Sequence, residues 1–259
     1  MMEKTVIIIA TCLIALGSVT FLYAKPELIE RSFDVEQGGT FLIDTDLGSI
    51  EVASHNRNMV EVRVEKKGKN PENFEVSFSQ QGNDIKVVGD RKGISFWGGS
   101  GAHFVVKIPR NFNVDLKTSG GSIELSSLNG KVDAYTSGGS IRLGQIRGDV
   151  DVKTSGGSIR VDEVAGTINA HTSGGRISAR ISQQPIGDSR LTTSGGSVSA
   201  YLLPSIAVDL TASTSGGRVT SDFEVNGSFK KTRIVGQING GGPKLTLKTS
   251  GGSVKVKKL

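Results

Sequence analysis

Cysteine and aromatic residues are scarce in this chain of 259 residues, which contains 1 Cys, 1 Trp, 3 Tyr and 10 Phe. So few large rings disfavour the aromatic core of an ordinary enzyme domain. The single Cys12 lies in an N-terminal apolar run, so disulfides cannot stabilise the chain that follows it, and packing and backbone hydrogen bonds have to do so. Hydrophobic residues make up 36% and charged residues 22%, which excludes a disordered chain of low hydrophobicity.

Glycine and positive charge are abundant instead, and both concentrate in the second part of the chain. Of the 35 Gly, 24 lie in residues 114–259. Residues 25–113 hold 12 basic and 13 acidic side chains, a net charge of −1, whereas residues 114–259 hold 18 basic and 11 acidic side chains, a net charge of +7. The sequence therefore predicts two kinds of structure, with boundaries at residues 1–24, 25–113 and 114–259.

The N-terminal segment is typical of export. An uncharged apolar run covers residues 6–22 and is followed by Tyr23 and Ala24. Its 17 residues exceed a usual signal core and just reach the length that spans a bilayer, so residues 1–24 are expected to be either a signal peptide cleaved after Ala24 or an uncleaved membrane anchor. In both cases the rest of the chain is expected in the periplasm, at the cell surface or outside the cell.

The tetrapeptide Thr-Ser-Gly-Gly dominates the second part of the chain. Its seven copies are spaced by 18 residues three times, then by 21 twice and finally by 35, and Thr45 to Ile50 is a degenerate early copy. We expect its paired glycines to form tight structural turns. These glycines are Gly120, Gly121, Gly138, Gly139, Gly156, Gly157, Gly174, Gly175, Gly195, Gly196, Gly216, Gly217, Gly251 and Gly252.

Alignment of the copies predicts the fold. Aliphatic residues recur two positions before each Thr and five positions after it, and the residues between them alternate apolar and polar. This period of two indicates two short strands per unit, each with one buried face. Because one unit cannot bury that face alone, successive units are expected to stack as an all-β, parallel β-solenoid of about eight coils, with the Thr side chains forming a hydrogen-bonded ladder inside. The two aliphatic columns are Leu116, Ala134, Val152, Ala170, Leu191, Ala212 and Leu247, and Ile123, Ile141, Ile159, Ile177, Val198, Val219 and Val254.

Residues 25–113 lack the repeat but contain strand-like runs at 40–45, 60–64, 74–78, 85–88 and 104–108, with a hairpin turn at Gly82 to Asp84. We expect them to form a β-rich cap that covers the open end of the solenoid. A glycine-rich loop there holds Phe96 and Trp97. This pair is a candidate aromatic contact for a membrane or a sugar, or else a plug over the solenoid end.

The passage KIPRNFNV at residues 107–114, running into LKTSGGSI at residues 116–123 and the later repeats, resembles the bacterial "putative adhesin" family of exported domains of unknown function. The resemblance covers roughly residues 40–259. It implies a mainly parallel β-solenoid outside the cytoplasmic membrane, and it implies no catalytic residues.

The residues themselves indicate no catalytic centre, metal site or cofactor. His55, His103 and His171 have no partner at ligand spacing, and no nucleophile motif is present. Asp115, Asp133 and Asp151 share one column that could bind a cation or flank a glycosidic bond. Neutralisation of this column by Lys117, Lys131 and Lys153 is the alternative we favour.

Outward-facing cations suggest a binding face for an anionic ligand, with Lys117, Arg142, Lys153 and Arg160 as its candidates. The possible partners are an anionic envelope glycan, lipid headgroups or another envelope protein, whereas export argues against nucleic acid. The sequence thus favours an exported, non-enzymatic adhesin or envelope scaffold. The alternatives are a polysaccharide-acting β-helix enzyme and a regulatory envelope module held by the uncleaved anchor.

Overall fold

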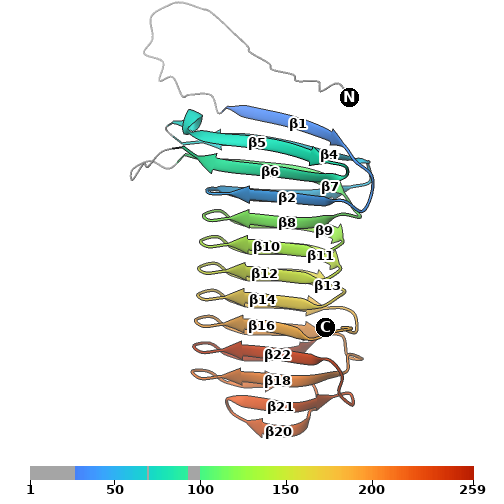
Figure 1. The fold of residues 1–259 in the computed structure, drawn as a ribbon. Coiled ribbons are helices and arrows are strands. Elements are labelled where there is room, and N and C mark those ends of the chain that lie inside the picture. The colour runs from blue at the N-terminus through green and yellow to red at the C-terminus, as the bar shows by residue number, and fades with distance from the viewer. Residues whose placement is uncertain (1–26, 69, 93–99) are drawn as a thin grey trace, which may run out of the picture.

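The computed structural model describes residues 27–68, 70–92 and 100–259, and within these ranges it consists of two long sheets of 11 and 12 strands that pack face to face (Figure 1). The only helical element described is the single 3-10 turn η1 (Pro71–Asn73), so the all-β prediction is confirmed. None of the described residues forms a helix of the length and apolarity needed to cross a membrane. The predicted export segment, residues 1–24, lies outside the described residues.

Five coils form the middle of the stack, and each coil places one strand in each sheet. Corresponding residues of successive coils lie directly opposite each other in parallel ladders, as Val132 does with Val114 and Val150. The predicted parallel β-solenoid is therefore confirmed. The coils are β8 (Asn113–Thr118) with β9 (Ile123–Asn129), β10 (Val132–Thr136) with β11 (Ile141–Arg147), β12 (Val150–Thr154) with β13 (Ile159–Val164), β14 (Ile168–Thr172) with β15 (Ile177–Ile181), and β16 (Ser189–Thr193) with β17 (Val198–Leu202).

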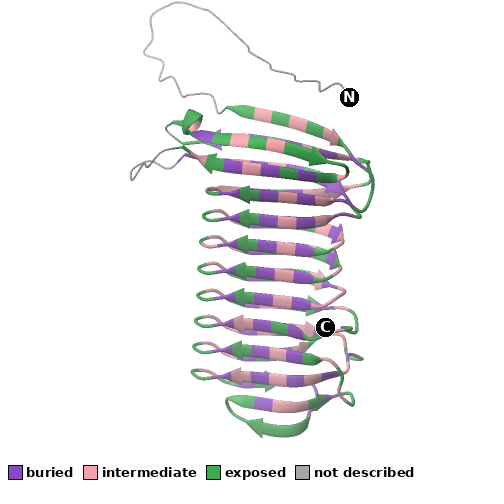
Figure 2. Cartoon of the chain, in the orientation of Figure 1, coloured by how far each residue is buried: buried purple, intermediate pink, exposed green. Residues whose placement is uncertain are grey.

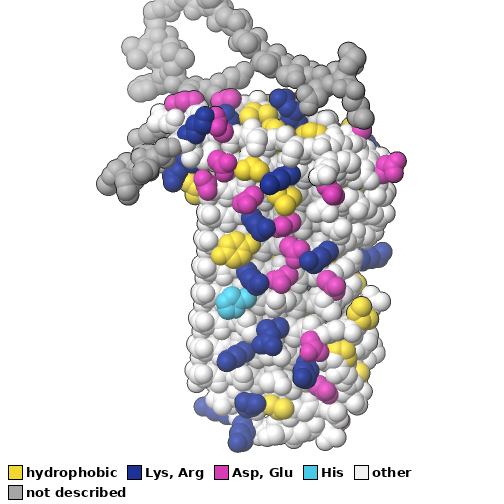
Figure 3. Space-filling model, viewed as in Figure 1, with side chains coloured by type: hydrophobic (Ala, Val, Ile, Leu, Met, Phe, Trp, Pro, Cys, Tyr) yellow, Lys and Arg dark blue, Asp and Glu magenta, His cyan; other side chains and the backbone are white. Residues whose placement is uncertain are grey.

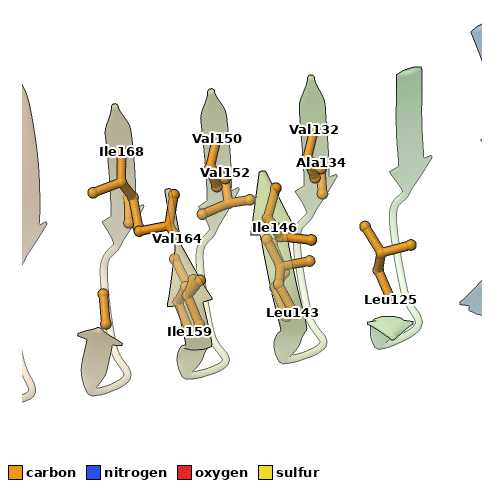
Figure 4. Close-up of a cluster of buried hydrophobic side chains, with 14 of the residues drawn as sticks. Leu125, Val132, Ala134, Leu143, Ile146, Val150, Val152, Ile159, Val164 and Ile168 are labelled. Carbon is orange, nitrogen blue, oxygen red and sulfur yellow. The ribbon is translucent and has the colours of Figure 1, made fainter. Parts of the chain in front are cut away.

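The core is a thin aliphatic layer between the two sheets. Buried and exposed residues alternate along the strands, as the stripes in Figure 2 show, because successive side chains of a strand point to opposite faces. Figure 4 shows side chains such as Ile159 and Val164 from one sheet facing Val150 and Val152 from the other. Both predicted aliphatic columns are buried throughout, with Val219 the most exposed member at 8%.

The C-terminal end corrects the expectation that units stack in chain order. The last coil in the sequence, β22 (Lys244–Thr249) with β23 (Val254–Lys258), lies between the β16–β17 coil and the coil of β18 (Val208–Thr214) and β19 (Val219–Ser221). It pairs in parallel with the strands on both sides. The intervening strands β20 (Asn226–Lys230) and β21 (Arg233–Ile238) form an antiparallel hairpin that extends the 12-stranded sheet past β18.

The N-terminal end repeats this arrangement. The coil of β2 (Thr40–Thr45) and β3 (Gly48–His55) lies between the β8–β9 coil and a coil of β6 (Asp84–Arg91) and β7 (Gly101–Pro109). Three antiparallel strands complete this end: β1 (Leu28–Asp34), β4 (Met59–Lys67) and β5 (Phe74–Gln81). The predicted hairpin turn joins β5 to β6. With five middle coils and two at each end, nine coils stack, so the predicted cap itself supplies two of them.

The Thr side chains point inward as predicted, but they do not bond to one another. Thr136 Oγ1 donates to the carbonyl oxygen of Gly121 in the preceding coil at 2.7 Å, and it accepts from the N–H of Gly139 in its own turn at 3.3 Å. The same pair of bonds recurs at Thr154, Thr172, Thr193, Thr214 and Thr249. Each buried hydroxyl therefore joins two coils and closes its own turn.

The two glycines of the turn after Thr136 have different roles. A Cβ added to Gly139 would overlap the backbone carbonyl of Gly121 in the preceding coil, whereas a Cβ added to Gly138 would lie 3.7 Å from its nearest backbone neighbour. In this turn only the second glycine is required by the close approach of two coils, whereas in the last repeat the first glycine is also tight, because a Cβ on Gly251 would lie 2.9 Å from the Gly195 carbonyl oxygen. The turns stack in one column, visible as the loops along the left edge of Figure 1.

Each coil is joined to the next by a second turn, at the other edge of the sheets. Two hydrogen bonds between such turns, from Thr167 to Asp149, predict a contribution to stability that acid removes. The Asp149 carboxylate accepts from the Thr167 hydroxyl at 2.6 Å and from the Thr167 N–H at 2.9 Å, and these bonds hold the pKa of Asp149 below its usual value. The pKa of Asp149 is lower in the folded chain than in the unfolded chain, where it is near 3.8. The ionised carboxylate therefore stabilises the fold at pH values above about 3.8, and this contribution disappears as the pH falls through the pKa of the folded state.

Asp149→Asn is therefore expected to lower the free energy of unfolding at about pH 6, and by less at about pH 3, below the unfolded pKa. Urea titrations at several pH values measure this difference. The matched control is Asp222→Asn, which changes an exposed carboxylate whose side chain makes no hydrogen bond within the described residues. Equal losses at both pH values for Asp149→Asn would contradict the assignment.

Candidate anionic-ligand site

The four predicted cations do not share one face, which corrects the sequence-based site. Lys117 on β8 and Lys153 on β12 belong to the 12-stranded sheet, whereas Arg142 on β11 and Arg160 on β13 belong to the 11-stranded sheet. All four face outward, but the core separates the two pairs. The reason is that each unit has one strand in each sheet, so residues on either side of a Thr-Ser-Gly-Gly turn end on opposite faces.

The 12-stranded sheet has an outer face of mixed charge, on which basic and acidic side chains intersperse (Figure 3). The column of Asp115, Asp133 and Asp151 is in register as predicted, and lysines neutralise it. Lys117 lies 3.0 Å from Asp115, Lys131 2.8 Å from Asp133 and Lys153 3.5 Å from Asp151. Hydrogen bonds to Asp115 and Asp133 raise the pKa values of Lys117 and Lys131, so these lysines stay charged and paired.

The 11-stranded sheet carries a different feature on its outer face, a hollow of about 820 Å³ that runs from β11 to β23. We call it the cationic hollow. Five basic side chains and no carboxylate line it, together with serines, glycines and one tyrosine. The basic residues are Arg142, Arg160, Arg176, Lys255 and Lys257.

A second, smaller hollow of about 490 Å³ adjoins it toward the N-terminal end and shares Arg142 and Arg160. Here acidic side chains balance the arginines: Arg142 lies 3.3 Å from Glu124, and Arg160 lies 2.7 Å from Asp162. Glu51 adds a third carboxylate. The face is therefore acidic and basic at the N-terminal end and purely basic toward the C-terminal end.

Small side chains form the middle of the cationic hollow. Ser178 on β15 and Ser199 on β17 lie in one column, half-buried, with Arg160 before them and Lys255 after them. Tyr201 is half-buried in the next outward column, where the Arg180 guanidinium lies 5.8 Å from its ring centroid. The short serines leave the space, and the longer basic side chains border it.

Arg176 occupies the position directly after a Gly-Gly pair, which is a serine in most copies of the repeat. The hydroxyl of that serine accepts a hydrogen bond from the backbone N–H of the corresponding residue in the next coil. Ser140 Oγ, for example, accepts from the Ser158 N–H at 3.2 Å. Arg176 replaces serine at this position, and its own N–H donates to Ser158 Oγ at 3.1 Å. The substitution keeps the backbone arrangement and adds an exposed cation, a signal that the repeat alignment contained.

Lys255 and Lys257 reach the hollow only because the last coil is inserted. Lys255 pairs in register with Ser199, and Lys257 with Tyr201. Stacking in chain order would have placed Thr220 beside Ser199 instead. The 35-residue spacing before the last repeat was the only sequence signal of this rearrangement, and it does not specify where the last coil lies.

The described residues offer little that resembles a catalytic centre. All three histidines have local hydrogen bonds, and no group of three metal-binding side chains was found among the described residues. Ser49 Oγ lies 2.7 Å from His103 Nδ1, and Glu51 lies 3.8 Å from His103 Nε2. Neither Ser49 nor His103 lines the adjoining hollow, although Glu51 does.

The predicted aromatic contact, Phe96 and Trp97, lies outside the described residues. Its role as contact or plug stays a prediction.

Comparison with known families gives one match to this chain. The family described as Toastrack DUF4097 matches residues 112–257. This range covers the repeat, including nearly all of the inserted last coil, and every residue that lines the cationic hollow. No curated protein matches the chain.

Several solved bacterial structures are similar to the chain. A "putative cell adhesion protein" from Clostridium sporogenes shares 14% identity, covers 91% of this chain and 100% of its own, and has a TM-score of 0.39. A "putative adhesin" from Bacteroides fragilis shares 14% identity, covers 90% and 97%, and has a TM-score of 0.43. A "putative lipid binding protein" from Parabacteroides distasonis shares 15% identity, covers 92% and 98%, and has a TM-score of 0.34.

Proposed function

The chain belongs to the Toastrack DUF4097 family, and from that premise we propose that it is an exported, non-enzymatic binding protein of the cell envelope, an adhesin or scaffold. Its cationic hollow binds an anionic ligand. The rigid solenoid presents this hollow at a fixed place on the outer face of the 11-stranded sheet.

The observation that carries the proposal is the uncompensated charge of the hollow. Arg176, Lys255 and Lys257 make no ion pair within the described residues, in contrast to the paired lysines of the 12-stranded sheet. Several cations around one concave surface raise the local concentration of anions. Arg142 and Arg160, at the N-terminal end of the hollow, are ion-paired with Glu124 and Asp162 and can still contact the same ligand.

Export is proposed from the sequence. The uncharged run at residues 6–22 would direct the chain across the cytoplasmic membrane, and a +7 segment outside it would meet the anionic polymers of an envelope. Whether the run is cleaved decides between a free protein and a tethered one. Mass spectrometry of the mature N-terminus distinguishes these two forms.

The side chains on the outer face of the 11-stranded sheet fit ligand binding better than glycoside hydrolysis. A glycosidase needs two carboxyl groups that flank the scissile bond. The cationic hollow has no carboxylate, and two of the three in the adjoining hollow are ion-paired with arginine. Such a face can hold an anion but does not present a free pair of carboxyl groups for glycoside hydrolysis.

The proposal is tested by retention of the mature protein, purified from the envelope of cells that export it, on immobilised anionic polymers. We expect retention at low salt and release as salt screens the charges. Lys255→Ala with Lys257→Ala should weaken binding by about tenfold, because each exposed pairing contributes up to about 1 kcal/mol.

The matched control is Lys244→Ala with Lys248→Ala. These two lysines are exposed on the same coil but on the other sheet, so the net charge changes equally. Retention of the control should equal that of the parent protein. Equal loss in both double variants, or no retention on any anionic polymer at low salt, would overturn the proposed function.

A further inference from the structure

We infer that the ligand of the cationic hollow is an acidic polysaccharide that lies along the axis of the stack, across several coils. This inference rests on the proposed function and assigns the chemical class of the ligand. It depends on three features of the hollow: the separation of its cations, the hydroxyl groups between them and the single aromatic ring beside them.

The cations are separated along the axis. Arg160, Ser178, Ser199 and Lys255 occupy four successive strands of one sheet, so about 14 Å separates the backbone at Arg160 from that at Lys255, at ~4.8 Å per strand. One phosphate or one headgroup would contact both ends only if both long side chains reached inward to it. A polymer that repeats its anionic groups can contact both ends without this, and its sugar rings would lie over the serines.

The middle of the hollow suits sugars. Ser178 and Ser199 present hydroxyls, which can donate to and accept from the hydroxyls of a sugar. Tyr201 adds a half-buried ring with a polar end, an amphipathic surface like that of a pyranose. A bare polyphosphate chain would use the cations and could accept from the hydroxyls, but it has no apolar surface to pack on the ring of Tyr201.

The charge pattern also limits where the polymer lies. Glu51 and Glu124 border the adjoining hollow at the N-terminal end and repel further anionic groups there. A bound chain therefore extends from the Arg142 and Arg160 end toward Lys255 and Lys257. We expect affinity to rise with oligomer length until both ends are reached and then to change little.

The test measures binding of the mature protein to uronic acid oligosaccharides of increasing length, to inorganic polyphosphate and to phosphatidylglycerol vesicles. The oligosaccharides should bind most tightly. Tyr201→Ala should weaken their binding by about fivefold, as expected for loss of an aromatic contact, and should leave polyphosphate binding unchanged. Tyr135→Ala is the matched control, because Tyr135 is 44% exposed on the other sheet, and it should change nothing.

The outcomes separate this inference from the proposed function. If polyphosphate or vesicles bind at least as tightly as the oligosaccharides and depend on Lys255 and Lys257, the hollow binds anions but the polysaccharide inference is wrong. Oligosaccharide binding that is unaffected by Tyr201→Ala also overturns the inference. If no anionic probe depends on Lys255 and Lys257, both the inference and the proposed function fail.

Discussion

Gly139→Ala is expected to lower the free energy of unfolding by about 3 kcal/mol, near the upper end for overpacking a close contact. The added Cβ would overlap the carbonyl oxygen of Gly121, which belongs to the backbone of the preceding coil. That carbonyl also accepts the 2.7 Å hydrogen bond from Thr136. A backbone held by strand pairing on both sides has little room to shift, so the two coils must separate locally.

The matched control is Gly138→Ala, one residue earlier in the same turn. Its Cβ would lie 3.7 Å from the nearest backbone atom, and Gly138 does not have a positive φ. We expect a change of less than about 1 kcal/mol, since alanine fits and restricts the unfolded chain. Urea unfolding of both variants measures the difference. Equal losses would show that the turn needs glycine for another reason.

Removal of residues 244–259 is expected to unfold the C-terminal end of the stack. The last coil buries Leu245, Leu247, Val254 and Val256, which together contribute about 6 to 12 kcal/mol, comparable to the total stability of many domains. Strands β18 to β21 would then have no neighbouring coil on their inner side. The middle coils should stay folded, because each coil of a solenoid contacts mainly its neighbours.

Hydrogen exchange measured by mass spectrometry checks this result. In the truncated chain β18 should exchange rapidly while β8 to β13 stay protected. A pair of full-length variants tests the same point without deletion. Leu247 is fully buried, so Leu247→Asp should reduce the protection of β18, whereas Thr246 faces outward beside Arg190, so Thr246→Asp should not. Unchanged protection of β18 in the truncated chain would contradict the role of the inserted coil.

The local pattern was readable from the sequence because it follows from covalent geometry. Side chains alternate along a strand, so the columns through Leu116 and Ile123 could be identified as buried, and the repeat made the parallel register explicit. The pairing of the Asp115 column with lysines was also predictable from the spacing of opposite charges. The buried faces and the register of the middle coils could be predicted in this way, but the hydrogen-bond partners of the Thr hydroxyls and of Asp149 could not.

The candidate site was less predictable, because it depends on contacts that the repeat does not encode. Assigning Lys117 and Arg142 to one face required knowing which strands share a sheet, and each unit crosses between the two sheets. Placing Lys255 beside Ser199 required the order of the coils in space. The last two repeats share one pattern, so periodicity alone does not specify which of them lies beside β16 and β17. The replacement of serine by Arg176 could be seen in the sequence, but its place in the lining of the cationic hollow could not be predicted.

The inserted coils also determine how the molecule responds to a pulling force. A solenoid whose last coil forms its tip can be unzipped from that end, one ladder of hydrogen bonds at a time. Here β22 bonds to both β16 and β18, and β23 to both β17 and β19, so tension on the C-terminus must break the ladders on two sides together. At the other end β2 and β3 are held between neighbours in the same way. The inserted last coil therefore resists unravelling from the C-terminus, whereas at the N-terminal end the edge strand β1, which pairs only with β4, would separate before β2 and β3.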